Sequence, residues 1–297
     1  MEESGFKIAV IGLGIIGGSA AMALKEFKNA KVAGCDINKK TRRAALECGA
    51  VDFVSADPRE VIRDADIVVM CVYPELIAKI VTEQRGVFKR GAVITDVCGI
   101  KEPLRKMLDG KFPDGCEYIG GHPMAGKETD GFSSASADLF RGCGYIITPL
   151  YNATERGIRL VRSMAEYMGA ARITEADAET HDRIIAYTSD LMHVSASALC
   201  LNYNKEMNLA YTAGAFRDCT RIANINPKLW SELFIENREN LLYEIDGLTR
   251  ALGAIRQAIE RSDREELEEI LETVRTNKLK MQRTEPKKAV KNVESFK

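Results

Sequence analysis

The chain has 297 residues, of which 45% are hydrophobic and 29% charged, and its net charge is −1 with a pI near 6.4. These values are typical of a globular protein with one large or two ordinary domains. The near-zero net charge argues against the broad basic field of a nucleic-acid or membrane-surface binder. No apolar run reaches the roughly 20 residues of a membrane span, and the polar start MEESGFK does not resemble a signal peptide.

The cysteine pattern excludes several kinds of site. The chain has eight cysteines and no C-x-x-C pair, and several cysteines lie inside apolar runs such as IVVMCV. This pattern predicts reduced, mostly buried thiols rather than disulfides or a zinc site. We therefore expect no metal and a reducing, cytoplasmic location.

The first half of the chain alternates short apolar runs with helix-like stretches. The expected strands are rich in Val and Ile and nearly continuous in apolarity, as in a parallel sheet covered on both faces. They lie at residues 6–13, 31–36, 52–55, 66–72, 91–97, 118–123 and 145–149. This alternation predicts an α/β fold, a Rossmann-type, doubly wound, mostly parallel sheet.

From about Ala153 onward the apolar residues recur at helical spacing. The helical stretches run over residues 153–170, 177–203, 227–260 and 264–282, and no convincing strand is predicted among them. We therefore expect a Rossmann domain over residues 1–150 and an all-α domain over residues 151–297, with the boundary near Pro149. The polar, basic stretch 283–297 is predicted to be a frayed tail.

The stretch IAVIGLGIIGGSAAMAL carries glycines in the G-x-G-x-x-G spacing. The pattern follows a predicted strand, opens an Ala-rich helix and is followed by an acidic strand end, which is the context of a dinucleotide site. The acidic residue, Asp36, suits the ribose hydroxyls of NAD, although the basic cluster at 39–43 could offset its repulsion of a 2′-phosphate. The alternative is a glycine-rich turn without ligand. The predicted cofactor-binding residues are Gly12, Gly14, Ile15, Ile16, Gly17 and Asp36.

His122, in GGHPMAGKE, is one of only three histidines in the chain. A lone histidine is more often structural than catalytic. Here it is expected at the carboxyl edge of the sheet, beside the glycine loop, where open α/β sheets bind ligands. It precedes a proline, follows two glycines and has Glu128 six residues on. A neutral imidazole suits the task of accepting a hydroxyl proton near pH 7.

The motifs TDVCGIK, GGHPMAGKE, SDLMH and TRIANINPKLW, in this order, resemble the prephenate dehydrogenase family of tyrosine biosynthesis. The resemblance runs from about Phe6 to the helices after Trp230. It implies a Rossmann domain followed by a helical domain that binds substrate and forms a homodimer. It also implies NAD-dependent oxidative decarboxylation of prephenate to 4-hydroxyphenylpyruvate, with arogenate (a cyclohexadienyl dehydrogenase activity) as the alternative substrate.

The resemblance also implies roles for single residues. His122 would polarise the substrate hydroxyl as a catalytic acceptor, and Glu128 would gate or order the site. Arg221 would hold a substrate carboxylate, with an interdomain salt bridge as the alternative. The remaining expected lining residues are His193, Gly214 and Trp230. The alternative for His193 is helix packing, and for Trp230 a place in the core. The third histidine, His181, is expected on the solvated surface.

Two positions depart from the family pattern. Gly99 stands where many members have a serine that would contact the histidine, the substrate or the nicotinamide; water or the thiol of Cys98 would have to substitute. Asp190 stands where some relatives have a second histidine. At i,i+3 spacing from His193 it is expected to favour a protonated His193, or to meet the amino group of arogenate.

Two other functions remain open from the sequence. One is another NAD(P)-dependent dehydrogenase with a Rossmann and a helical domain, such as a 3-hydroxy-acid dehydrogenase or an imine reductase. The other is a dinucleotide-binding regulator without catalysis, which the missing serine at Gly99 would suit.

Overall fold

The computed structural model describes residues 5–127, 129–204 and 206–283. The chain forms two compact units, residues 1–241 and 242–297. The first unit holds the sheet and the helices that contact it. The second holds most of one long helix and the helix that follows.

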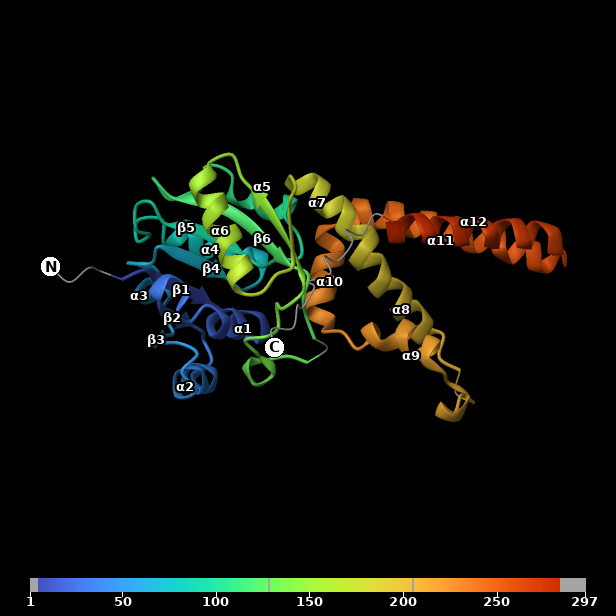
Figure 1. Ribbon diagram of the computed structural model, residues 1–297, viewed down its shortest axis with the longest axis horizontal. Helices are drawn as coiled ribbons and strands as arrows, with labels where there is room; N and C mark the ends of the chain where they lie inside the picture. The colour runs from blue at the N-terminus through green and yellow to red at the C-terminus, as the bar shows by residue number, and fades with distance from the viewer. Residues whose placement is uncertain (1–4, 128, 205, 284–297) are drawn as a thin grey trace, which may run out of the picture. The chain divides into compact units, whose positions relative to one another are not determined.

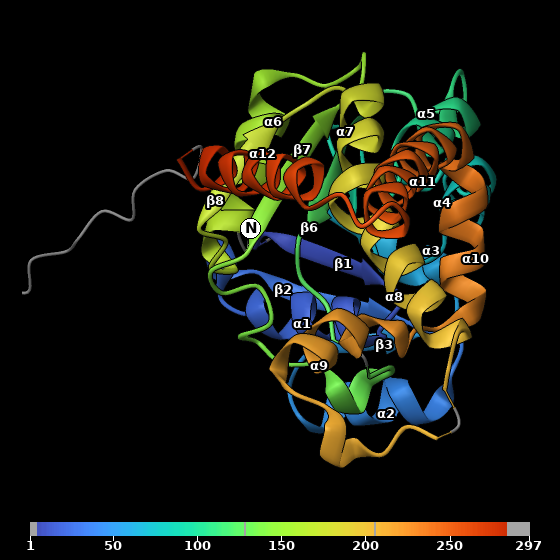
Figure 2. The same ribbon diagram turned by 90° about the vertical axis from the view of Figure 1, so that its right-hand side faces the viewer.

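All seven predicted strands are confirmed. An eighth strand follows them, and all eight form one sheet in the order β3-β2-β1-β4-β5-β6-β7-β8. The strands are β1 (Lys7–Ile11), β2 (Lys31–Cys35), β3 (Phe53–Ser55), β4 (Ile67–Met70), β5 (Val93–Asp96), β6 (Glu117–Pro123), β7 (Gly144–Pro149) and β8 (Arg172–Glu175). Strands β1 to β6 run parallel, and β7 is antiparallel to β6 (Figures 1 and 2).

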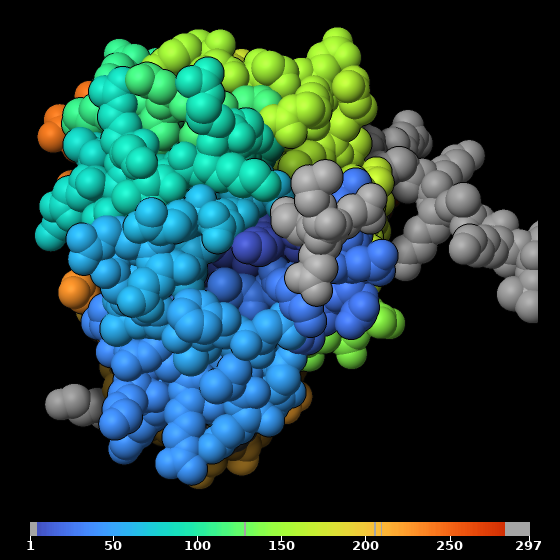
Figure 3. Space-filling model, turned by 90° about the vertical axis from the view of Figure 1, so that its left-hand side faces the viewer, coloured from blue at the N-terminus to red at the C-terminus, as the bar shows by residue number. Residues whose placement is uncertain are grey.

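Helices cover both faces of this sheet, as the doubly wound prediction requires. They are α1 (Ile15–Ala23), α2 (Lys39–Glu47), α3 (Pro58–Ile62), α4 (Pro74–Glu83), α5 (Glu102–Leu108) and α6 (Glu155–Tyr167). Helices α1, α2 and α6 contribute to one buried cluster, and α3, α4 and α5 to the other. The space-filling view shows the blue to green segments of the first half packed into a continuous surface (Figure 3).

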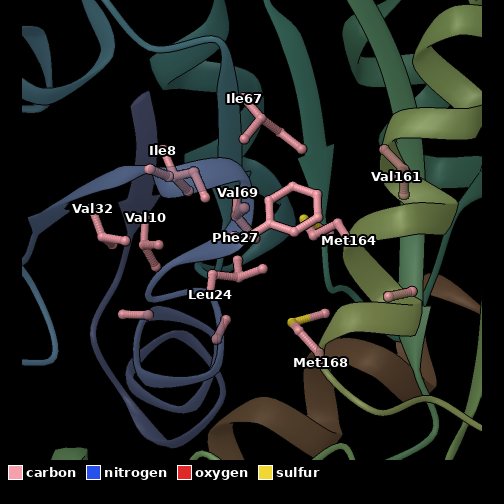
Figure 4. Packing of buried hydrophobic residues seen from close by; sticks show 14 of the residues in the cluster. Ile8, Val10, Leu24, Phe27, Val32, Ile67, Val69, Val161, Met164 and Met168 are labelled. Carbon is pink, nitrogen blue, oxygen red and sulfur yellow. The ribbon is translucent and has the colours of Figure 1, made fainter. Parts of the chain in front are cut away.

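The alternation of side chains along the strands builds these two clusters. In β1, Ile8 and Val10 point to one face while Ala9 and Ile11 point to the other, and all four are at most 2% exposed. Figure 4 shows Ile8 and Val10 in the first cluster with Met164 of α6. The near-continuous apolarity of the strands therefore has the predicted cause, because both faces are buried.

The prediction that no strand follows Ala153 is wrong. Strand β8, with the sequence RITE, pairs in parallel with β7, and α6 is the crossover between them. The sheet thus continues to Glu175, past the boundary predicted near Pro149. The strand was missed because it has only four residues and three of them are exposed, so it lacks the apolar run that marked the other seven.

The helices after the sheet confirm the predicted helical character. They are α7 (Ala178–Ile185), α8 (Leu191–Leu201), α9 (Gly214–Thr220), α10 (Pro227–Glu236), α11 (Arg238–Glu260) and α12 (Arg264–Arg283). A π-helical turn, Ala186–Asp190, joins α7 to α8 without a break. By length and composition alone, the helix 178–201 could cross a membrane, yet its first part is bonded to the sheet domain through buried polar side chains. The predicted tail lies mostly outside the described residues.

A substitution in the glycine loop tests the packing of α1 on β1. A Cβ at Gly17 would overlap the carbonyl oxygen of Gly12, whereas a Cβ at Gly14 would meet nothing within 4 Å. We expect Gly17→Ala to lower the free energy of unfolding by about 1–3 kcal/mol or more, which is a drop of several degrees in the thermal midpoint. The matched control Gly14→Ala should leave the midpoint of the ligand-free protein unchanged; equal midpoints for both variants would contradict this packing.

Candidate active site

The carboxyl ends of β1, β4, β5 and β6 meet at one edge of the sheet, because these strands are parallel. The glycine loop follows β1, and His122 is the penultimate residue of β6. The switch point between β1 and β4 falls on this edge, which is where open α/β sheets bind ligands. The predicted position of His122 on this edge is confirmed.

The glycine loop has the form of a dinucleotide cradle. Gly12 adopts φ +88°, and α1 begins at Ile15 with no side chain capping its first turn. The first backbone N–H groups of a helix have no partner within it, and α1 begins just after the carboxyl end of β1, so these groups are available to an anion at this edge. One carboxylate oxygen of Asp36 accepts from the N–H of Leu13 at 2.9 Å and the other from Asn38 at 2.8 Å, so the carboxylate is held against the loop.

Three side chains form a row that begins at His122. Its Nδ1 lies 2.9 Å from Nε2 of His181, whose Nδ1 lies 2.7 Å from Oδ1 of Asp182. The prediction that His181 is solvated is wrong: His181 is 1% exposed and Asp182 2%. The reason is that α7 lies beside α5 and β7 (Figure 2), so this turn of the helix faces inward.

Asp182 also fixes the start of α5. Its two carboxylate oxygens accept the backbone N–H groups of Lys101 and Glu102, each at 2.8 Å. A carboxylate at this place completes two donors that the helix itself leaves unpaired and favours its positive end. The same side chain therefore joins α7 to the loop that follows β5.

A buried ion pair stabilises that loop from within. Nζ of Lys101 lies 2.6 Å from Oδ1 of Asp96 and donates to the carbonyl of Cys98 at 2.7 Å. The hydroxyl of Tyr118 donates to the other oxygen of Asp96 at 2.9 Å. The two charged side chains are 3% and 0% exposed. Removing one partner of such a pair leaves a buried charge and costs about 3–5 kcal/mol, so the loop has little freedom.

Gly99 lies next to the ring of His122. A Cβ at Gly99 would be 4.0 Å from Cε1 of His122 and 3.6 Å from Leu233 of α10. The position thus has room for a small side chain, but this chain places no hydroxyl there. The thiol of Cys98 is directed to the carbonyl of Val72 at 3.6 Å, which gives it a partner other than the imidazole.

The surroundings of His122 keep its ring neutral. Burial, then the positive charge of Lys101, then His181 lower the pKa of His122 well below its usual 6.5. Burial also lowers the pKa of His181, against the opposing effect of Asp182. At neutral pH each ring therefore carries one proton and has one nitrogen available as an acceptor.

A second group of predicted residues gathers on α8 and α10. The rings of His193 and Trp230 stack with centroids 3.5 Å apart and an interplanar angle of 27°. Burial and then the charge of Arg221 lower the pKa of His193, so the guanidinium acts on this imidazole. Leu233 follows Trp230 by three residues on α10, so the two side chains are neighbours on the helix surface. Because Leu233 also lies beside Gly99, the second group adjoins the His122 region. Gly214 begins α9 and is exposed, and a Cβ at this position would meet nothing within 4 Å.

The expected effect of Asp190 on His193 is wrong. Asp190 is 3% exposed and accepts from the amide of Asn237 at 2.9 Å, while Nδ1 of His193 lies 3.0 Å from the carbonyl of Ser189. The i,i+3 spacing of the two residues lies in regular helix at the start of α8, but each side chain is bonded to another group. The pKa of His193 is lowered, not raised. Glu128, predicted to gate or order the site, lies outside the described residues.

Comparison with known families identifies the two parts of the chain. Residues 20–174 match the nucleotide-binding domain of prephenate dehydrogenase, and residues 177–273 match the prephenate dehydrogenase dimerization domain. The chain belongs to the prephenate dehydrogenase family. The family-level resemblance inferred from the sequence is thereby confirmed.

Named relatives support this assignment. The cyclohexadienyl dehydrogenase of Zymomonas mobilis is 33% identical over 86% of this chain and 89% of its own length. The prephenate dehydrogenase of Bacillus subtilis is 29% identical over 90% of this chain and 74% of its own length. The structure is also similar to that of prephenate dehydrogenase from A. aeolicus in complex with hydroxyphenyl propionate and NAD+. The TM-score is 0.83 and the identity 27%, over 95% of this chain and all of that one.

Several residues of this family member's site were not predicted. They are Asp96, Lys101, His181, Asp182 and Asn237. A signal for two of them is present in the sequence. The spacing of 178, 181, 182 and 185 is that of an apolar helix stripe, and all four residues are buried. Polar residues on such a stripe indicate buried partners.

The pH dependence of stability tests the environment of Asp190. Burial raises its pKa from the ordinary 3.8 to about 6. This contribution to stability is fully present below the unfolded pKa and is lost as pH rises through about 6, since the folded state then holds an ionised buried carboxylate. Asp190→Asn keeps an acceptor for Asn237 without that charge. We expect the variant to gain about 1–3 kcal/mol of unfolding free energy over wild type between pH 4 and 7, measured by urea titration. Parallel stability curves would contradict the assignment.

Proposed function

We propose that this family member catalyses the NAD-dependent oxidative decarboxylation of prephenate to 4-hydroxyphenylpyruvate, with His122 as the acceptor for the substrate hydroxyl. The observation that carries the proposal is a neutral, half-buried imidazole at the carboxyl edge of the sheet, on the same edge as the glycine loop. A neutral imidazole at this place suits a hydroxyl that becomes more acidic as its carbon loses a hydride.

The glycine loop and Asp36 would hold the cofactor. The N–H groups at the start of α1 suit the pyrophosphate, and the carboxylate of Asp36, held beside Leu13, suits the ribose hydroxyls. NAD bound there supplies the hydride acceptor. The oriented carboxylate favours NAD over NADP because it would repel a 2′-phosphate.

The reaction needs little more from the protein than orientation and charge. Hydride leaves the carbinol carbon, the carboxylate on the opposite ring carbon leaves as CO2, and its electron pair restores the aromatic ring. The oxygen ends as a phenol, so His122 holds the hydroxyl proton during the step without a net change in protonation. Formation of the aromatic ring makes the step irreversible.

The second group of residues, on α8 and α10, would bind the substrate. Arg221 would bind a substrate carboxylate through its guanidinium, which pairs with carboxylates in a bidentate manner. His193 and Trp230, stacked on each other, would border the ring, with Gly214 and Gly99 lining the remainder. Glu128 would order the site. Arogenate is the alternative substrate. It is supported by the relative named cyclohexadienyl dehydrogenase, because that name does not restrict the substrate to prephenate. We do not propose that Asp190 meets the amino group of arogenate, because its carboxylate is buried and accepts from Asn237.

The proposal is tested by NADH absorbance at 340 nm after mixing protein, NAD and prephenate, with arogenate in parallel. In His122→Asn the side-chain amide occupies the place of Nδ1, and no atom occupies the place of Nε2, so the substrate hydroxyl loses its acceptor. We expect kcat to fall by about 10²–10⁴, the usual contribution of a positioned proton acceptor, while NAD binding stays unchanged. A wild-type protein that binds NAD but forms no NADH with either substrate would instead be the regulator. Unaltered turnover in the variant would exclude His122 as the acceptor.

A 3-hydroxy-acid dehydrogenase is the remaining enzymatic alternative. The chain is similar to the 3-hydroxyisobutyrate dehydrogenase of Salmonella typhimurium at 13% identity with a TM-score of 0.58. At this identity the likeness concerns the fold alone. Activity with 3-hydroxyisobutyrate and none with prephenate would favour that reading.

We also propose a homodimer formed through the helical part. Residues 177–273 match a family dimerization domain, and the unit 242–297 exposes large apolar side chains that water disfavours. They include Leu242, Tyr243, Leu252, Ile259, Leu271 and Val274, each more than half exposed. We expect light scattering to give twice the chain mass of 32.9 kDa and Leu252→Lys to shift the protein towards monomer. A wild-type monomer at micromolar concentration would contradict the proposal.

A cytoplasmic location is part of the same proposal. All eight cysteines are free, but the prediction that they are mostly buried is wrong. Five of them are exposed or partly exposed: Cys48, Cys71, Cys143, Cys200 and Cys219. Free thiols of this kind suit a reducing compartment. Fractionation of cells that express the full chain would test the location.

A further inference from the structure

The row of Asp182, His181 and His122 connects two distant parts of the chain. His122 is on β6, whereas His181 and Asp182 are on α7. The two histidines are 59 positions apart in the sequence. Both links are within hydrogen-bond distance, at 2.7 and 2.9 Å, and His181 and Asp182 are almost fully buried. Buried polar groups at such distances form hydrogen bonds of defined direction.

Asp182 sets the direction of both bonds. Its carboxylate accepts the N–H groups of Lys101 and Glu102, so it faces its neighbours as an acceptor. His181 must then donate from Nδ1, and because its ring is neutral its Nε2 has only a lone pair. That lone pair accepts from Nδ1–H of His122. Nε2 of His122 is thus left without a proton.

We propose that His181 and Asp182 are positioning residues that hold His122 as the Nδ1–H tautomer, so that its Nε2 lone pair accepts the hydroxyl of the substrate. This inference deepens the proposed function and depends on it for the role of His122. It does not depend on which substrate provides the hydroxyl. The bond to His181 also fixes the rotation of the ring.

Gly99 makes this support necessary. A residue with a hydroxyl at that position would lie next to Cε1 of His122, and the glycine provides none. The charged groups outside the row that act on the two imidazole rings are Lys101 and Asp96, which pair with each other. Among the described contacts of the ring, the bond to His181 is the one that distinguishes its two nitrogens.

Two amide substitutions at position 181 separate positioning from simple packing. In His181→Asn the amide reaches the place of Nδ1, so it can still donate to Asp182 but cannot reach His122. In His181→Gln the amide oxygen reaches the place of Nε2 and can accept from His122. Positioning predicts that the Asn variant loses about 10- to 100-fold in kcat, the usual effect of a residue that orients a site group, and that Gln restores most of it, with KM unchanged in both.

A structural role predicts the opposite order, since only the Asn variant keeps the bond to Asp182. A Gln variant as slow as, or slower than, the Asn variant would therefore overturn the proposal. Thermal midpoints of both variants identify any loss of folding. If the Asn variant is unfolded, the spectroscopic measurement on wild-type protein decides.

That measurement reads the tautomer directly and needs no substrate. The chain has only three histidines, so ring ¹⁵N signals of histidine-labelled protein can be assigned with three single variants. We expect the proton of His122 on Nδ1 in wild type and in His181→Gln, and shared between both nitrogens in His181→Asn. A wild-type proton on Nε2 would overturn the proposal, even if prephenate is turned over. The expected tautomer with no turnover would refute only the proposed function.

Discussion

The carboxylate of Asp182 is the interaction on which the arrangement of this site depends. It accepts three donors from two separate elements: the N–H groups of Lys101 and Glu102 at the start of α5, and Nδ1 of His181 on its own helix. A buried carboxylate is costly unless its oxygens are paired, so the three donors must be present together. Its presence thus determines how α7 seats on the loop after β5. The ring of His122 is oriented as a consequence.

The buried pair of Asp96 and Lys101 acts on the same loop from the other side. It fixes the backbone of Cys98 through two further bonds, from Cys98 N–H to Asp96 and from Lys101 to the Cys98 carbonyl. A pair of this kind adds little net stability compared with apolar residues. Its effect here is geometric and electrostatic. It holds Gly99 beside His122, and its cation opposes protonation of that ring.

The sequence predicts those features that arise from local pattern and fails where tertiary contacts decide. Seven strands, the glycine loop and the edge position of His122 follow from apolar runs and from strand direction, which are local. Strand β8 exists because β7 offers it a partner, and its own residues are mostly polar. The burial of His181 depends on α7 packing against α5 and β7. From the sequence alone, a histidine near the start of a helix is predicted to be exposed to solvent, because that packing is not known.

The error at Asp190 also arises from a tertiary contact. Asn237 binds the carboxylate of Asp190 from 47 positions away in the sequence, and the i,i+3 argument did not include it. The π-helical turn Ala186–Asp190 immediately precedes α8. One added residue rotates the side chains that follow by about 100° relative to those before. His181 lies before this turn and His193 after it, on one continuous helix. The turn therefore sets the direction of the His181 ring, which orients His122, relative to that of the His193 ring, which stacks on Trp230. A helix of regular geometry between the same two histidines would give them a different pair of directions.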